Sequence, residues 1–419
     1  MSFALLWLLQ AGFVLATWAV LGLRSQGELL YRLGHAGGFY AFFYLLFFLL
    51  PQLVGALSGQ WAIIGYEAAH ELSRKGVFLA TQARLTGFSA AVFIGAALMA
   101  RWLPLPVTRF HRLCPLPLPQ TLQIYLWLCF GFGLCGHAVL AWQSLSLTGF
   151  RSDLLKSPSG MALTALSFQA GFAFALLLAT GLLQGRRGQA LLLIALLAPL
   201  VVIQGARGRL LWPLLIAALL IACWRNRLPL WRWLGLGALL SGLLAVMDPL
   251  RYAVLRGLSP DISLLRELSQ IFLARTFDGF ASFALILDGG RMQADPQLLF
   301  SGIRDDFMRA YYPEVLAQGV AFGSGLPGWF WLSGGGAAGF LALSLVYGLF
   351  LGLLALLLRR LRHLFLVVAL LFCCIWLCAL AGDFVESLDK MLASCFAGLL
   401  GALLIPARAG PAGARRHFG

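Results

Sequence analysis

The sequence predicts an all-α polytopic membrane protein with about eleven transmembrane helices. The chain has 419 residues, of which 61% are hydrophobic and 11% are charged, and its mean hydropathy is +0.87. Soluble proteins carry about 25% charged residues, so a water-soluble core is excluded. The apolar residues form long runs without strand alternation, and about 20 helical residues cross a bilayer. The runs are therefore helices rather than barrel strands.

The expected spans divide the chain into three regions. An N-terminal bundle of about eight spans (1–247) is followed by one large loop (248–336). A C-terminal region of about three spans ends in a basic tail (337–419). The first span lacks the charged beginning of a cleaved signal peptide, so we read it as a membrane helix. The expected spans are 3–23, 36–57, 77–100, 121–141, 161–183, 189–204, 210–224, 233–247, 337–358, 364–381 and 391–407.

Arginine is concentrated on one side of the expected bundle. One set of loops and the tail holds 16 of the 31 Lys and Arg residues, with Glu28 as the only acid, and the positive-inside rule places this set in the cytoplasm. Eleven spans then put the N-terminus and the large loop in the periplasm and the C-terminus in the cytoplasm. Because the net charge of +15 follows this pattern, it indicates a membrane protein rather than a nucleic-acid-binding protein. The basic set is Arg24, Arg32, Arg101, Arg109, Arg112, Arg186, Arg187, Arg225, Arg227, Arg232, Arg359, Arg360, Arg362, Arg408, Arg415 and Arg416.

The loop 248–336 is where a functional site is expected. Ionisable residues away from the cytoplasmic rim of a membrane protein indicate function. A loop of this length should contain amphipathic helices. One is expected to begin near Ser259 and to seat the apolar run 280–283 on the bundle, and the Gly-rich end (319–336) is either a moving lid or a passive re-entrant connection. The loop holds nine of the 16 acids, namely Asp248, Asp261, Glu267, Asp278, Asp288, Asp295, Asp305, Asp306 and Glu314.

The sequence predicts no metal site and no cofactor. All eight cysteines lie in expected spans or in a loop placed in the cytoplasm, so disulfides are not expected, and no Cys/His cluster occurs. Asp305 and Asp306 are adjacent, but neighbouring side chains on a helix diverge by about 100° and do not easily share one ion. The large loop contains no histidine, which excludes a histidine-based mechanism there.

Arginines near the outer ends of spans are candidates for binding phosphate. Arg207 and Arg209 lie in the short turn Gln204-Gly-Ala-Arg-Gly-Arg, and a guanidinium group matches phosphate oxygens in a two-pronged geometry. Arg251 follows an expected span, and Arg275 lies three residues before Asp278. The plain alternatives are contact with ordinary lipid phosphates for the first pair and a weak surface ion pair for the last.

Three carboxylates are candidates for proton transfer or substrate orientation. Asp278 follows Arg275, Glu314 precedes the Gly-rich run, and Asp383 lies in a short outer turn that holds three acids. A carboxylate can act as a general base when it reaches the reacting hydroxyl. A solvated loop charge is the alternative for each.

Several of these features together resemble the Wzy-type oligosaccharide repeat-unit (O-antigen) polymerases. They are the late large outer loop, Glu314 before a Gly-rich stretch, and three local patterns. The patterns are Gly-Ala-Arg-Gly-Arg (205–209), Arg-Thr-Phe-Asp-Gly-Phe (275–280), and Gly-Leu-Pro-Gly-Trp-Phe-Trp-Leu-Ser-Gly-Gly-Gly (325–336) running into a span. The resemblance covers the architecture of most of the chain and local patterns from about 200 to 390.

The resemblance implies a GT-C-like glycosyltransferase of the bacterial inner membrane. It would polymerise undecaprenyl-diphosphate-linked repeat units on the periplasmic face, by inversion and without a metal. Its partners would be the lipid-linked donor and acceptor, membrane lipids and a Wzz-type chain-length regulator. The residues assigned to the diphosphate are Arg207, Arg209, Arg251 and Arg275, and those assigned to the acceptor hydroxyl are Asp278, Glu314 and Asp383.

Three alternatives remain open at the level of sequence. An O-antigen ligase would transfer glycan to lipid A core, but the lack of histidine in the large loop counts against it. A flippase or other transporter would need charges at mid-membrane depth, where Arg84 is the only charged residue well inside an expected span. A non-catalytic membrane scaffold is the third alternative.

Overall fold

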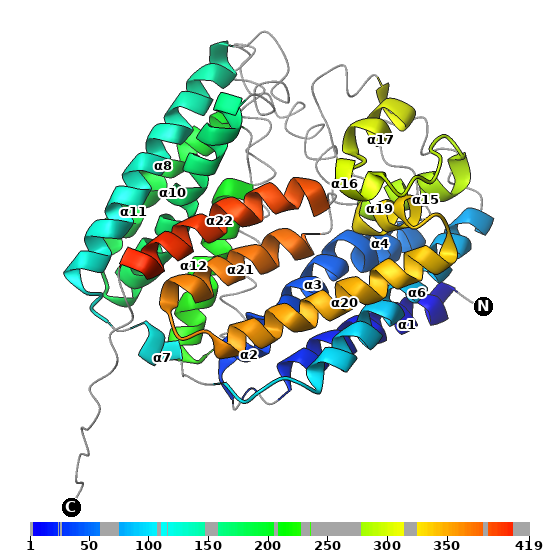
Figure 1. Ribbon diagram of the computed structural model, residues 1–419, viewed down its shortest axis with the longest axis horizontal. Coiled ribbons are helices and arrows are strands. Elements are labelled where there is room, and N and C mark those ends of the chain that lie inside the picture. Colours follow the sequence, from blue (N-terminus) through cyan, green and yellow to red (C-terminus); the bar gives the residue numbers. More distant parts are fainter. Residues whose placement is uncertain are drawn as a thin grey trace, which may run out of the picture.

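The protein is a bundle of helices that are mostly long and apolar (Figure 1). The computed structural model describes residues 3–23, 25, 27–58, 75–106, 110–114, 116–146, 158–204, 208–227, 235, 278–313, 325–379 and 384–404. All regular secondary structure within these ranges is helical. The helices are α1 (Phe3–Gly22), α2 (Leu29–Leu33), α3 (Ala36–Tyr44), the π-helix η1 (Leu45–Leu49), α4 (Leu50–Ser58), α6 (Lys75–Ala100), α7 (Phe110–Leu113), α8 (Gln120–Ser146), α10 (Pro158–Leu183), α11 (Arg187–Gln204), α12 (Gly208–Arg225), α15 (Asp278–Gly289), α16 (Leu298–Ser301), α17 (Arg304–Tyr311), α19 (Gly325–Ser333), α20 (Ala337–Arg360), α21 (Leu364–Cys378) and α22 (Phe384–Leu404).

Eight of the described helical segments are long and apolar enough to cross a membrane, which confirms the predicted class of polytopic helical membrane protein. The expected number of eleven stays a prediction. The expected spans 364–381 and 391–407 correspond to the shorter apolar helices Leu364–Cys378 and Lys390–Leu404, and 233–247 lies outside the described residues except for Gly235. The eight segments are Phe3–Gly22, Ala36–Leu53, Val77–Ala100, Gln120–Gln143, Ser159–Leu183, Arg187–Gln204, Gly208–Arg225 and Ala337–Arg360.

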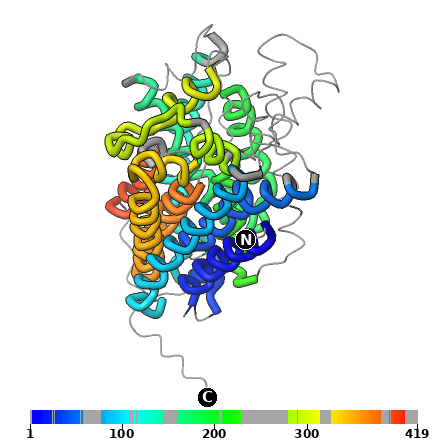
Figure 2. Tube along the Cα trace, turned by 90° about the vertical axis from the view of Figure 1, so that its right-hand side faces the viewer, coloured from blue at the N-terminus to red at the C-terminus, as the bar shows by residue number. Residues whose placement is uncertain are grey.

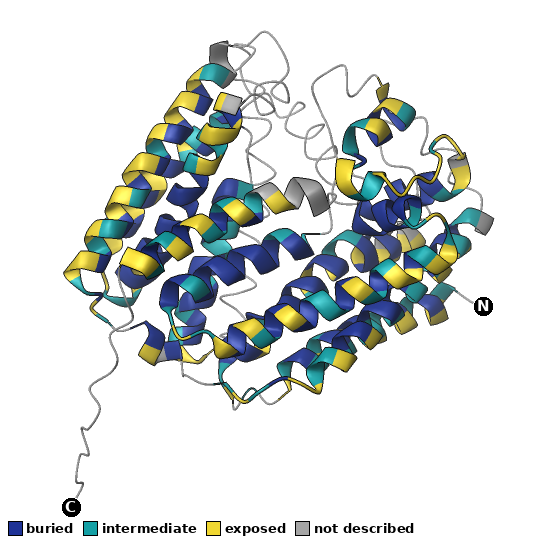
Figure 3. Cartoon of the chain, in the orientation of Figure 1, coloured by how far each residue is buried: buried dark blue, intermediate teal, exposed yellow. Residues whose placement is uncertain are grey.

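The helices form two groups on either side of α21. In the first group, α6 packs between α1 and α20, and α3 packs on α1 and α20 (Figures 1 and 2). In the second group, α8, α11 and α12 pack on α10. Helix α21 contacts α3 of the first group and α12 of the second, with α22 alongside. All of its residues are buried except Leu366 and Trp376, whereas the outer faces of α8 and α11 are largely exposed (Figure 3).

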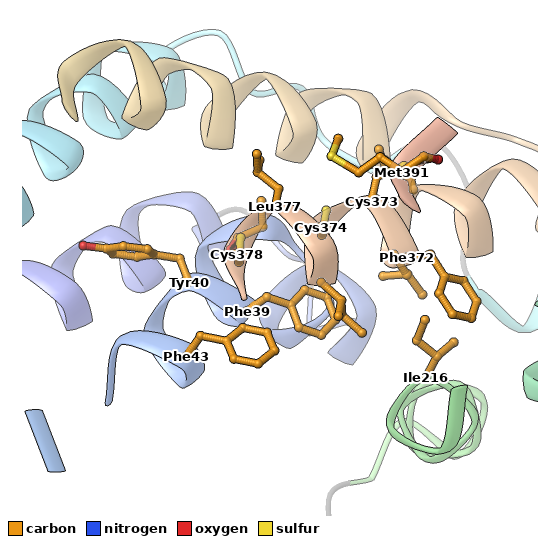
Figure 4. Packing of buried hydrophobic residues seen from close by; sticks show 14 of the residues in the cluster. Phe39, Tyr40, Phe43, Ile216, Phe372, Cys373, Cys374, Leu377, Cys378 and Met391 are labelled. Atoms are coloured by element: carbon orange, nitrogen blue, oxygen red, sulfur yellow. Dashed lines mark hydrogen bonds between the residues drawn. The ribbon is translucent and has the colours of Figure 1, made fainter. Parts of the chain in front are cut away.

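The core around α21 is built from aromatic, aliphatic and cysteine side chains. Phe39, Tyr40 and Phe43 of α3 approach α21 from one side, and Ile216 of α12 and Met391 of α22 approach it from others (Figure 4). The cysteines on α21 are buried packing residues here. All eight cysteines of the chain are free.

Close helix contacts depend on residues without a bulky side chain. A Cβ atom on Gly348 of α20 would overlap the carbonyl oxygen of Val92 on α6, and a Cβ atom on Gly133 of α8 would overlap the backbone of Ala170 on α10. In lipid the hydrophobic effect does not drive helices together, so close van der Waals packing of small residues has to hold them.

A π-helical turn places a buried polar cluster inside the first group. Tyr44 and Gln52 are eight positions apart, so they would point about 80° apart on a regular α-helix at about 100° per residue. The π turn η1 between them takes up one extra residue and reduces the offset to about 20°. Both side chains then face Gln10 of α1, with the Tyr44 hydroxyl 3.2 Å and Gln52 Nε2 3.1 Å from Gln10 Oε1, and Gln82 Nε2 donates to Gln52 Oε1 at 3.0 Å. The expected span 36–57 did not include this irregularity.

The two ends of the bundle carry different charges. At the end that includes α2 and α7, which we call the basic end, the described connections hold Arg32, Arg101, Arg112, Arg186, Arg187, Arg225, Arg227, Arg359, Arg360 and Arg362. The opposite end carries α15, α16, α17 and α19, and we call it the loop end (Figure 1). Both signs of charge occur there, with Asp288, Asp295, Asp305 and Asp306 beside Arg291, Arg304 and Arg309. Helix α12 ends at the basic end and α15 begins at the loop end, and the span expected between them (233–247) stays a prediction.

Buried Arg359 joins three segments at the basic end. Its side chain is 1% exposed and donates to the carbonyl oxygens of Leu21 at 2.9 Å, Pro104 at 3.0 Å and Leu23. The carbonyls of Leu21 and Leu23 lie at the end of α1, and that of Pro104 lies in the connection after α6. Carbonyl groups at helix ends have no partner within their own helix. Arg359 therefore has a structural role in α20, which its expected position in a cytoplasmic loop did not suggest.

The described parts of the large loop are packed helices. Residues 279–286 of α15 are buried and the helix contacts α6, η1 and α19, as predicted for the apolar run 280–283. The Gly-rich end is an ordered helix over 325–333, largely buried and packed on α20. Gly335 and Gly336, with φ of 67° and 131°, form the turn into α20. In the range 325–336 the structure has a packed helical connection, and a movement of this segment stays a prediction.

Candidate functional site

Of the seven residues predicted to act on substrate, Arg209 is the one whose side chain the structure describes. Asp278 is the first residue of α15, and its side chain is not described. The other five, Arg207, Arg251, Arg275, Glu314 and Asp383, lie outside the described residues. The structure therefore shows the surroundings of Arg209 and leaves the expected meeting of the other residues as a prediction.

Arg209 is a buried cation near the loop end, held by neutral side chains. It is 9% exposed and lies in the first turn of α12. Its Nη1 donates to Ser167 Oγ of α10 at 2.9 Å and to Gln204 Oε1 of α11 at 3.1 Å, and its Nη2 donates to Thr164 Oγ1 of α10 at 3.3 Å. The Arg209 guanidinium is therefore enclosed by α10, α11 and α12.

Gln204 connects Arg209 to a buried histidine on α8. Gln204 Nε2 donates to the carbonyl oxygen of His137 at 2.7 Å, and the amide group faces His137 Nδ1 at 3.1 to 3.2 Å. His137 and Gln204 are 0% and 1% exposed. The polar network thus joins α8, α10, α11 and α12 inside an apolar region, where every buried polar group needs a partner.

Aromatic side chains close the other side of the site. The Arg209 guanidinium carbon lies 5.4 Å from the Phe168 ring centroid, within the range of a cation–π contact. Trp376 of α21 packs edge-on against Phe168, with ring centroids 5.6 Å apart, and Lys390 Nζ of α22 lies 5.1 Å from a Trp376 ring centroid. Between them is a hollow of about 10 Å³, lined by Ser167, Phe168, Gly171, Gly208, Arg209, Pro213, Phe372 and Trp376.

Among the described residues, the site carries positive charge without a matching carboxylate. None of the acidic residues that the structure describes is paired with Arg209, and the acceptors around it are two hydroxyls and one amide. A buried charge interacts strongly over short distances because the surroundings have a low effective dielectric constant. The described arrangement therefore favours an anion at this end of the bundle.

A second arginine inside a span has a different environment. Arg84 of α6 is half-buried, donates to the carbonyl oxygen of Ala80 at 3.2 Å, and lies 4.8 Å from the Trp331 ring centroid of α19. Arg84 was the one charge expected well inside a span. Arg209, which is enclosed by α10, α11 and α12, is more deeply buried than Arg84 and lies close to the start of its helix.

Sequence reasoning found Arg209 from its Gly-rich turn but missed most of its partners. His137, Thr164 and Ser167 lie within expected apolar spans and were not singled out as functional residues. Trp376 was not distinguished from the other aromatic residues. Thr164 and Ser167 are three positions apart and so share a helix face. That spacing was a usable signal of a polar stripe, whereas nothing local connects His137 or Trp376 to Arg209.

The fold and this site define a polytopic helical membrane protein with a cationic, aromatic-lined site near one end of its bundle. Comparison of the chain with protein-family models, with curated proteins and with solved structures finds no match.

Proposed function

We propose that the chain is a membrane glycosyltransferase of the bacterial inner membrane. It polymerises undecaprenyl-diphosphate-linked oligosaccharide repeat units into a surface polysaccharide on the periplasmic face. The observation that carries the proposal is the buried guanidinium of Arg209 near the loop end, which has only neutral described partners. The reaction is inferred from the sequence resemblance. The positive charge of Arg209 at this end of the bundle suits the negatively charged diphosphate leaving group.

The leaving group explains why fixed cations are needed. The acceptor hydroxyl attacks the anomeric carbon of the donor sugar with inversion, a new glycosidic bond forms, and the bond to the diphosphate oxygen breaks. Negative charge develops on the departing lipid diphosphate, and preorganised donors that meet this charge are a large source of catalysis. Arg207, Arg251 and Arg275 contact the diphosphate in this proposal. Arg209 is assigned to the same diphosphate, and its guanidinium is held in place by side chains of α10 and α11.

A carboxylate takes the proton from the acceptor hydroxyl. Asp278, Glu314 and Asp383 are the candidates, and the geometry that would choose between them involves side chains outside the described set. The described residues that adjoin Arg207, Glu314 and Asp383 in sequence are Gly208, Pro313 and Phe384. The starts of α12 and α22 and the end of α17 lie at the same end of the bundle as the start of α15 (Figure 1). This common placement supports one site that draws on segments far apart in the sequence.

Polymerisation by the purified protein is the decisive test. The full chain in vesicles is supplied with a labelled lipid-linked repeat unit, and product length is measured with and without EDTA. We expect polymer in both cases, and a Wzz-type regulator should change the length distribution. No polymer from folded protein with several repeat-unit substrates, or label transferred to lipid A core instead, would refute the proposal.

Arg209→Gln tests the cation in the same assay, with Arg309→Gln as the matched control. Arg309 is also at the loop end, but its side chain is 70% exposed and pairs with Asp306 at 3.7 Å. Loss of a preorganised donor to a developing charge costs about 100-fold or more in rate. We expect that loss for Arg209→Gln and near-normal activity for Arg309→Gln, at equal amounts of folded protein.

A further inference from the structure

Two free cysteines face each other where α21 packs on α22. The sulfur atoms of Cys373 on α21 and Cys395 on α22 are 3.1 Å apart, and one thiol donates a hydrogen bond to the other. Cys373 Sγ also lies 3.8 Å from the carbonyl oxygen of Met391 on α22, its neighbour in Figure 4. A disulfide bond is about 2.05 Å long, so the two sulfurs are about 1 Å from bonding distance.

The packing of the two helices keeps this thiol pair together. A Cβ atom on Gly398 of α22 would overlap the side chain of Ala369 on α21, so the helices approach closely at this point. Cys373 lies four residues after Ala369, and Cys395 lies three residues before Gly398. Because positions three and four apart share a helix face, both cysteines lie on the faces that form this contact.

The pair is accessible from the outer side of α22. Cys373 is 4% exposed, whereas Cys395 is partly exposed and lies beside Leu392 and Phe396, which are 61% and 60% exposed. An exposed apolar face on a membrane helix contacts lipid, so a reagent that reaches Cys395 has to be small, neutral and able to enter lipid. Hydroperoxides are oxidants of this kind, and they oxidise thiols.

We propose that Cys373 and Cys395 form a redox modification site, at which a hydroperoxide converts the thiol pair into a reversible disulfide between α21 and α22. The more exposed Cys395 sulfur attacks the peroxide, whose oxygen–oxygen bond breaks. Cys395 becomes a sulfenic acid, and the other oxygen leaves as water or an alcohol with the thiol proton.

The second step joins the two helices. The Cys373 sulfur attacks the Cys395 sulfur, the S–S bond forms, and the sulfenic hydroxyl leaves as water with the Cys373 proton. In total the two thiols lose two electrons and the peroxide gains them. A dithiol reductant reverses the reaction by thiol–disulfide exchange.

The bridge would tie the two helices beside the Arg209 site. Trp376 lies three residues after Cys373, lines the hollow next to Arg209, and has Lys390 Nζ of α22 5.1 Å from a ring centroid. Oxidation would therefore fix the spacing of α21 and α22 near this wall of the site. Formation of the bridge does not depend on sugar transfer, so its test is separate from that of the proposed function.

The experiment counts thiols in the purified full chain. The folded chain is treated with hydrogen peroxide and unfolded, and its free thiols are alkylated and counted by mass spectrometry, with or without dithiothreitol before alkylation. We expect the count to fall from eight to six per chain and to return to eight with dithiothreitol. Proteolysis of the oxidised chain should release two peptides that are joined through Cys373 and Cys395.

Cys395→Ser removes one sulfur of the pair with little change in size, and peroxide should then give no bridge. Cys374→Ser is the matched control, because Cys374 is the next residue on α21 and is also buried, and it should leave the yield of the bridge unchanged. Cys373→Ala gives the same test if Cys395→Ser does not fold.

Three results would overturn the proposal. They are a count that stays at eight after peroxide, thiols that are lost without recovery in dithiothreitol, and a bridge that links other cysteines or persists in Cys395→Ser.

Discussion

At the scale of single residues, the buried polar side chains have the most specific roles. Arg209 and Arg359 are both arginines near helix ends, but one is surrounded by hydroxyl and amide groups and the other by backbone carbonyls. Arg359 completes the hydrogen bonding of helix ends, which explains its burial without any ligand. Arg209 makes no bond to a helix terminus among the described contacts, and this difference is why we connect it with an anion.

His35 provides a pH-dependent prediction at this scale. It lies before α3 at the basic end and is 2% exposed, with Nε2 3.0 Å from the carbonyl oxygen of Arg32. Burial lowers the pKa of His35 from 6.5 to about 3, and the positive charge of Arg359 acts in the same direction. Below pH 6.5 the unfolded chain therefore binds a proton that the folded chain does not, so stability falls as the pH falls from 6.5 toward 3.

We expect the free energy of unfolding to decrease by up to about 1.4 kcal/mol per pH unit below pH 6.5 through this group. The measurement is the unfolding temperature of the purified chain between pH 7.5 and 5. His35→Gln should be less stable at pH 7.5 but show a weaker dependence on pH. Equal slopes for the variant and the unmodified chain would contradict the assignment to His35.

At the scale of elements, helix existence was predictable and helix contacts were not. The apolar runs at 77–100 and 337–358 predicted two spans, which the structure confirms as α6 and α20. Their close packing depends on Gly348 facing Val92, and no local pattern marks that glycine among the 47 in the chain. The π turn η1 was likewise missed, because an apolar run has no sequence feature that distinguishes π from α geometry.

Gly348→Leu tests the contact between α6 and α20. A side chain at Gly348 would overlap the backbone of α6, and overpacking of this kind costs about 1–3 kcal/mol or more. We expect a lower unfolding temperature in detergent, measured by survival of monodisperse protein after heating. Gly12→Leu on the exposed face of α1 is the control, since a Cβ there meets nothing within 4 Å. A Gly348→Leu protein as stable as the control would show that the helices are not held this closely.

At the scale of the whole molecule, the separation of charges defines two ends. The arginines predicted to share a side do lie at one end wherever the structure describes them, and the described acids of the large loop lie at the other. Which end faces the cytoplasm stays a prediction from the positive-inside rule. The proposed reaction depends on it, because the lipid-linked substrate is expected on the opposite side.

Labelling of introduced cysteines would settle the orientation. Phe300, at the loop end, is 81% exposed, and Arg186, at the basic end, is also exposed. In cells with a permeable outer envelope, an impermeant thiol reagent should modify Phe300→Cys, and it should modify Arg186→Cys only after lysis. The unmodified chain with its eight native cysteines gives the background. Labelling in the reverse pattern would place the loop end in the cytosol and remove the basis for the proposed function.

The sequence by itself determined the membrane class, most of the helices and the sorting of charges into two ends. These are local properties, because a helix in lipid satisfies its own backbone and its apolar length can be read directly. Only the tertiary structure decided that α21 is the central buried helix and that Arg209 is enclosed by groups from α8, α10, α11, α12 and α21. Such contacts join residues far apart in the chain, and they depend on how helix surfaces fit together, which no local pattern specifies.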